Sequence, residues 1–76
     1  MNRIKSILTD LRPEFNFDES ENFVEDGYLD SFDIISLISA VEKEFDISVD
    51  GLDIIPENFI SYQAIAALIR KSGGSI

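Results

Sequence analysis

The stretch that decides the fold is GYLDSFDIISLISAVEKEF, residues 27–45. From Ser31 onward its large apolar residues return every three or four positions, which places them on one face of an amphipathic helix; they are Ile34, Leu37, Ile38, Val41 and Phe45. Asp30 is of the type favoured at a helix N-cap, and Asp33 adds negative charge to a first turn where the helix dipole is positive. The pattern predicts a helix over residues 31–45.

Two bulky apolar residues of this helix, Phe32 and Ile35, fall outside the buried stripe, on the flank that also carries Ser39. On the helical wheel they project toward solvent, where apolar groups can serve a binding surface. The alternative is that the preceding loop or the following segment covers them.

The same periodicity predicts a helix before Pro13 and another after Ser61. Their apolar faces hold Ile4, Ile7, Leu8 and Leu11 in the first, and Tyr62, Ile65, Ala66 and Ile69 in the last. Pro56 can begin a short helical turn through Phe59. Residues 13–30 have no sustained period and read as a long loop pinned by aromatic side chains, and such loops are usually functional or disordered.

These elements predict an all-α fold, a small four-helix bundle with three longer helices and one short third helix. At 76 residues the chain has the length of one domain, so we expect a single domain over residues 1–76. The segment MNRIKSILTDL lacks a continuous apolar stretch, which argues against a signal peptide or membrane span. A monomeric cytoplasmic protein is the expectation.

Composition excludes several classes of function. The chain contains no Cys and no His, so thiolate or imidazole metal sites, disulfides and Ser-His-Asp or Cys-His catalysis are unavailable. The net charge is −9, and residues 14–33 hold eight acids and no base. This field repels nucleic acid and anionic lipid but attracts basic protein surfaces, although acidic loops can also serve solubility alone. We expect a non-catalytic protein with protein partners.

Ser31 is the main candidate for chemistry. At the first position of a helix, free backbone N–H groups and the positive end of the dipole favour a phosphate on its hydroxyl. A serine there can also be a simple helix-start residue, which leaves both interpretations open. No His, nearby Lys or G-x-S-x-G motif could activate it, so any modification must come from another enzyme.

The 27–45 segment resembles the part of acyl carrier proteins that runs through the D-S-L motif into the second helix. The similarity extends to the first helix, the long loop, the Phe45-Asp46-Ile47 segment, the short helix near Pro56 and the helix after Ser61. It implies that Ser31 carries 4′-phosphopantetheine, transferred from coenzyme A by a phosphopantetheinyl transferase. The arm would supply the thiol that the chain lacks and hold its cargo as a thioester.

The resemblance also implies a docking surface for the transferase and for loading and synthase enzymes; the matching residues are Asp30, Phe32, Asp33, Ile35 and Glu42. It leaves the cargo open. Phe32, Ser36 and Lys43 depart from the fatty-acid carriers, which typically have Leu after the serine and a more acidic second helix. We therefore keep two alternatives for the cargo. One is an acyl group in fatty-acid, polyketide or related specialised biosynthesis, and the other is D-alanine or another aminoacyl group, because the D-S-F triplet also resembles the motif of D-alanyl carrier proteins.

Two rival interpretations remain. Residues Asp46, Ser48, Asp50, Gly51 and Glu57 occupy ligand and glycine positions of an EF-hand calcium loop, with Pro56 standing where the exit helix should run. A helical adaptor domain without a prosthetic group is the other alternative.

Overall fold

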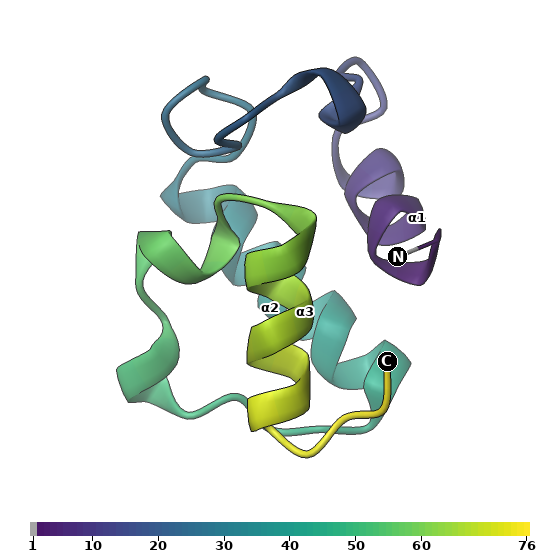
Figure 1. Ribbon diagram of the computed structural model, residues 1–76, viewed down its shortest axis with the longest axis vertical. Helices are drawn as coiled ribbons and strands as arrows, with labels where there is room; N and C mark the ends of the chain where they lie inside the picture. The colour runs from purple at the N-terminus through teal and green to yellow at the C-terminus, as the bar shows by residue number, and fades with distance from the viewer. Residues whose placement is uncertain (1) are drawn as a thin grey trace.

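The computed structural model describes residues 2–76, and Met1 lies outside the described residues. This part of the chain forms three α-helices, α1 (Asn2–Leu11), α2 (Ser31–Phe45) and α3 (Tyr62–Lys71), and contains no strand (Figure 1). The connections hold three short 3-10 helices, η1 (Phe17–Glu19), η2 (Gly51–Asp53) and η3 (Pro56–Phe59). The predicted all-α class and the predicted bounds of the central helix are confirmed.

The expected short third helix is present over Pro56–Phe59, but as a 3-10 helix, so residues 2–76 form three α-helices and not a bundle of four. η3 spans four residues, Pro56–Phe59, and its Asn58 N–H donates to the Ile55 carbonyl at 3.1 Å. Pro56 has no N–H to donate, and Ser61 already caps the next helix. So few residues between these two signals leave room only for the tighter i→i+3 hydrogen bonds.

The helix starts follow the predicted caps. The Asp30 carboxylate accepts from the Asp33 N–H at 2.9 Å, and the Asp33 carboxylate accepts from the Asp30 N–H at 3.2 Å. This reciprocal capping box satisfies backbone donors that the first turn of α2 cannot satisfy itself. In α3 the Ser61 hydroxyl accepts from the Ala64 N–H at 3.0 Å.

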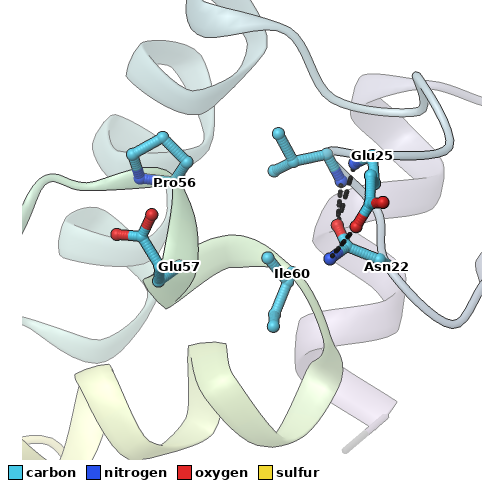
Figure 2. A pocket seen from close by; sticks show the side chains of 6 residues that line it. Asn22, Glu25, Pro56, Glu57 and Ile60 are labelled. Carbon is cyan, nitrogen blue, oxygen red and sulfur yellow. Dashed lines mark hydrogen bonds between the residues drawn. The ribbon is translucent and has the colours of Figure 1, made fainter.

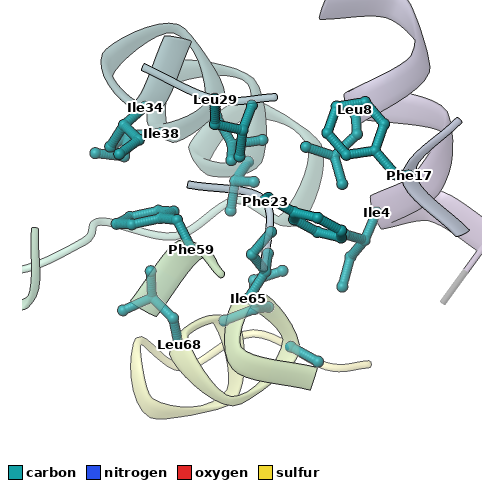
Figure 3. Close-up of a cluster of buried hydrophobic side chains, with 14 residues drawn as sticks. Ile4, Leu8, Phe17, Phe23, Leu29, Ile34, Ile38, Phe59, Ile65 and Leu68 are labelled. Carbon is teal, nitrogen blue, oxygen red and sulfur yellow. The ribbon is translucent and has the colours of Figure 1, made fainter. Parts of the chain in front are cut away.

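One apolar core joins the three helices (Figure 3). Its buried members are Ile4, Leu8, Phe17, Phe23, Leu29, Ile34, Leu37, Ile38, Val41, Phe59, Ile65, Ala66, Leu68 and Ile69. Three of the largest, Phe17, Phe23 and Phe59, come from connections and not from α-helices. The long loop is thus part of the core.

Along residues 2–76, no helix combines the length and apolar character required to cross a membrane.

Aromatic packing and a backbone hydrogen bond hold the long loop. Phe15 stacks on Tyr28 with ring centroids 4.4 Å apart, and Phe17 meets Phe23 edge-on at 5.0 Å. The Phe23 N–H donates to the Ile60 carbonyl at 2.8 Å, which fixes the loop to the segment before α3. The expected pinning by aromatics is therefore present in the structure.

We predict that Phe59→Ala lowers the free energy of unfolding by about 3–5 kcal/mol, because it removes a buried ring and leaves a cavity. Phe32→Ala makes the same change at a side chain that is 82% exposed, so its effect should stay within about 0.5 kcal/mol. Urea unfolding followed by circular dichroism measures both. Equal losses in the two variants would contradict the described core.

Candidate functional site

Ser31 is the first residue of α2, directly after the N-cap Asp30, and its side chain is exposed. The Asp30 carboxylate takes up the Asp33 N–H of the first turn, which leaves the N–H groups of Ser31 and Phe32 without carbonyl partners inside the helix, where the dipole adds partial positive charge. Beside Ser31 lies a hollow of about 230 Å³, lined also by Ile34, Ile35, Ile54, Ile55 and Pro56. A phosphate ester on the Ser31 hydroxyl would lie close to these N–H donors, with the apolar side chains of the hollow beside it.

A partly buried ion pair fixes this helix start. The guanidinium of Arg12 donates from Nε and Nη2 to one Asp33 carboxylate oxygen, at 3.0 and 2.9 Å. The Asp33 residue is only 7% exposed and is the sole charged residue among the buried side chains of residues 2–76. Arg12 follows α1, so this pair connects the end of α1 to the start of α2 across 21 residues of sequence.

The environment of Asp33 lowers the pKa of its carboxyl. Burial alone would raise that pKa, but the hydrogen bonds from Arg12 and from the Asp30 backbone favour the ionised form and outweigh it. The same contacts raise the pKa of the Arg12 guanidinium above its ordinary value, chiefly through its hydrogen bonds to Asp33. Both groups therefore stay charged at neutral pH.

The exposed apolar residues near Ser31 come from two segments. Phe32 and Ile35 are 82% and 61% exposed, as their place on the helical wheel predicted. Ile54 and Ile55, between η2 and η3, are exposed as well and share the hollow with Ser31. We call Phe32, Ile35, Ile54 and Ile55 the apolar platform. The sequence analysis identified only Phe32 and Ile35 as exposed apolar residues. The other part of the platform could have been suspected from the two consecutive isoleucines directly before Pro56.

The three acids expected at a docking surface, Asp30, Asp33 and Glu42, differ in their exposure and in their pairing. Asp30 is exposed, whereas Asp33 is buried in the pair with Arg12. Glu42 is half-buried, and its carboxylate accepts from the Val49 N–H at 2.9 Å, which ties the segment after α2 back to the helix. Asp33 and Glu42 therefore support the structure around the site, and Asp30 is the acid of the three that faces outward.

The EF-hand arrangement does not form. Asp46 adopts a left-handed conformation as the C-cap of α2, and the Asp50 carboxylate accepts from the Leu52 N–H at 2.9 Å. Glu57 lies on η3, where an EF-hand would have its exit helix. Across residues 2–76, no three His, Cys, Asp or Glu side chains are grouped so that they could hold a metal ion.

The fold and the site together form a small helical bundle with an exposed serine at the start of its central helix and exposed apolar residues near it. A family model described as "Phosphopantetheine attachment site" matches residues 2–70. The chain belongs to this family, which confirms the resemblance to acyl carrier proteins, and its covalent prosthetic group is 4′-phosphopantetheine. The comparisons with curated proteins and with solved structures gave no match.

Acid should destabilise the fold partly through Asp33. Because the folded chain lowers the pKa of this carboxyl, its contribution to stability is complete above its unfolded value of about 4. That contribution is lost as the pH falls through the folded pKa. We predict that Asp33→Asn lowers the melting temperature at pH 7 and flattens its decline between pH 5 and pH 2.

Melting curves across this pH range test the prediction. Asp10→Asn removes an exposed carboxylate of α1 and is the charge-matched control, which should decline like the wild type. A wild-type slope in Asp33→Asn would show that the pair with Arg12 has no such role.

Proposed function

We propose that the chain is a discrete carrier protein, one domain over residues 1–76, which holds acyl or aminoacyl groups as thioesters on a 4′-phosphopantetheine arm attached to Ser31. The observation that carries the proposal is the position of this serine. Its hydroxyl is exposed at the first residue of a firmly capped helix, next to the hollow and the apolar platform. Family membership supplies the prosthetic group that such a site would accept.

In the attachment step, the Ser31 Oγ attacks the phosphorus of coenzyme A that bears the pantetheine. The Oγ–P bond forms and the P–O bond to adenosine 3′,5′-bisphosphate breaks, so a phosphodiester remains on the protein. The hydroxyl proton passes to a base of the transferase, because this chain has no His and the neighbouring carboxylates of Asp30 and Asp33 are engaged in the helix cap. What the chain contributes is a fixed, accessible hydroxyl and the N–H groups of the first turn of α2.

Once attached, the arm supplies the thiol that bears the cargo. The chain holds no thiol of its own and acts as a non-catalytic partner of the enzymes that load and unload it. These would be the phosphopantetheinyl transferase and the loading and synthase enzymes, which would meet a monomeric carrier at Asp30, Phe32 and Ile35. Fatty-acid, polyketide or related specialised biosynthesis is the proposed setting, with D-alanyl or aminoacyl carriage as the second candidate. Cytoplasmic location stays a prediction.

Incubation with coenzyme A and a broad-specificity phosphopantetheinyl transferase should raise the mass of the wild-type chain by one arm. Ser31→Ala should show no gain in mass, because it removes the hydroxyl to which the arm would be attached. Ser39→Ala changes an exposed serine on the same helix and should be modified like the wild type. Intact-protein mass spectrometry separates the cases, and an unmodified wild type would refute the proposal.

Replacing Phe32 and Ile35 together by Ser should slow arm transfer about tenfold or more, because two exposed apolar contacts to the transferase are lost. Helix content by circular dichroism should stay at the wild-type level, since neither side chain is part of the core. Ile76→Ser alters an exposed apolar residue at the C-terminus and serves as the control. Unchanged transfer by the double variant would exclude Phe32 and Ile35 from docking.

A further inference from the structure

The central helix offers no free carboxylate to a partner enzyme. Besides Asp33 and Glu42, its third acid, Glu44, is paired with Arg3 at 2.9 Å. The outward flank of α2 that follows Ser31 consists of Phe32, Ile35, Ser39 and Lys43, all exposed. Apart from the exposed N-cap Asp30, a basic partner surface that approaches Ser31 must therefore find its negative charge on other elements.

A second hollow next to the site carries that charge. It has a volume of about 230 Å³ and is lined by Asn22, Val24, Glu25, Pro56, Glu57 and Ile60. Figure 2 shows Pro56 and Glu57 on one side of it, Asn22 and Glu25 on the other, and Ile60 between them. Two exposed acidic residues from different segments, Glu25 and Glu57, thus lie on opposite sides of a hollow that also has apolar walls.

The two sides of this hollow are held together. The Phe23 N–H donates to the Ile60 carbonyl at 2.8 Å, which joins the loop of Glu25 to the segment of Glu57. The Glu25 side chain is oriented by the Asn22 amide, which donates to its carboxylate at 3.2 Å. The Glu57 carboxylate makes no hydrogen bond or ion pair with another residue of the described range 2–76. A preformed hollow of this kind loses little conformational freedom when it binds.

The location connects this hollow to Ser31. Pro56 lines both this hollow and the one beside Ser31, so the two lie on either side of a single residue. An enzyme that brings coenzyme A to Ser31 covers the neighbouring surface. Arginine and lysine have apolar stems and cationic ends, which suit a hollow with apolar walls and carboxylates at its sides.

We propose that the hollow between Glu25 and Glu57 is a socket for an arginine or lysine side chain of the phosphopantetheinyl transferase. The inference rests on the proposed function and adds the contact that replaces the missing acids of α2. The stem of the basic residue packs on Val24 and Ile60, and its charge lies between the two carboxylates. The socket orients the transferase, while the apolar platform supplies the contact around Ser31.

The test compares steady-state arm transfer from coenzyme A, with a broad-specificity transferase, to the wild type and to Glu25→Gln/Glu57→Gln. At low salt kcat/KM should fall about tenfold, roughly threefold for each charge, as expected for exposed ion pairs. The loss should lie mainly in KM. Because salt screens exposed charges, the gap should close as NaCl rises toward 1 M, where the screening length is about 3 Å.

Asp10→Asn/Asp46→Asn is the matched control, since it removes two exposed acids near the other end of α2. It should keep a kcat/KM within twofold of the wild type. Should Glu25→Gln loosen the loop, Glu57→Gln alone carries the test, because Glu57 has no partner to lose.

Two outcomes would overturn the socket. Wild-type kinetics and salt dependence in the Glu25→Gln/Glu57→Gln variant would show that the hollow is not used. An equal loss in the control would mean that net charge, and not this hollow, steers the transferase. Failure of the wild type to accept any arm would instead refute the proposed function itself.

Discussion

The interaction on which the site depends is the pairing of Arg12 with the buried Asp33 carboxylate. The same carboxylate accepts the Asp30 N–H, so one side chain joins the end of α1, the cap of α2 and the first turn that begins with Ser31. A buried charge without partners is strongly unfavourable, which makes this arrangement selective for one placement of the helix start. The apolar core positions α2 as a whole, and the ion pair fixes where its first residue lies.

The chain has 15 acidic residues and only six basic ones, so few acids can be paired. Arg3, Lys5, Arg12 and Lys71 each pair with an acid elsewhere in the fold, and these pairs hold α1, the long loop and η2 in place. With so few bases, and most of them used internally, a surplus of acids remains on the surface. Much of that surplus lies on the loop before α2, and Glu57 on η3 adds one more acid. We therefore expect a field that would attract basic partners to come mainly from beside the central helix.

Local patterns in the sequence predicted what depends on local physics. The 3.6-residue period placed α2 over residues 31–45, and the wheel placed Phe32 and Ile35 outside. What the sequence could not show depends on contacts between distant residues. Asp33 resembled a free acid because its partner, Arg12, is 21 residues away. The exposure of Ile54 and Ile55 depends on the path of the chain between α2 and α3, which no periodic pattern in the sequence predicts.

The proposed function thus rests on a small bundle that leaves the Ser31 hydroxyl accessible at the start of a capped helix, where partner enzymes would modify and load it. The central claim is that the arm is attached to this hydroxyl. Fragmentation mass spectrometry of the wild-type chain, after modification with coenzyme A and a transferase, locates the arm directly. The account predicts that every modified fragment carries phosphopantetheine on Ser31. An arm on any other residue, or no arm at all, would contradict it.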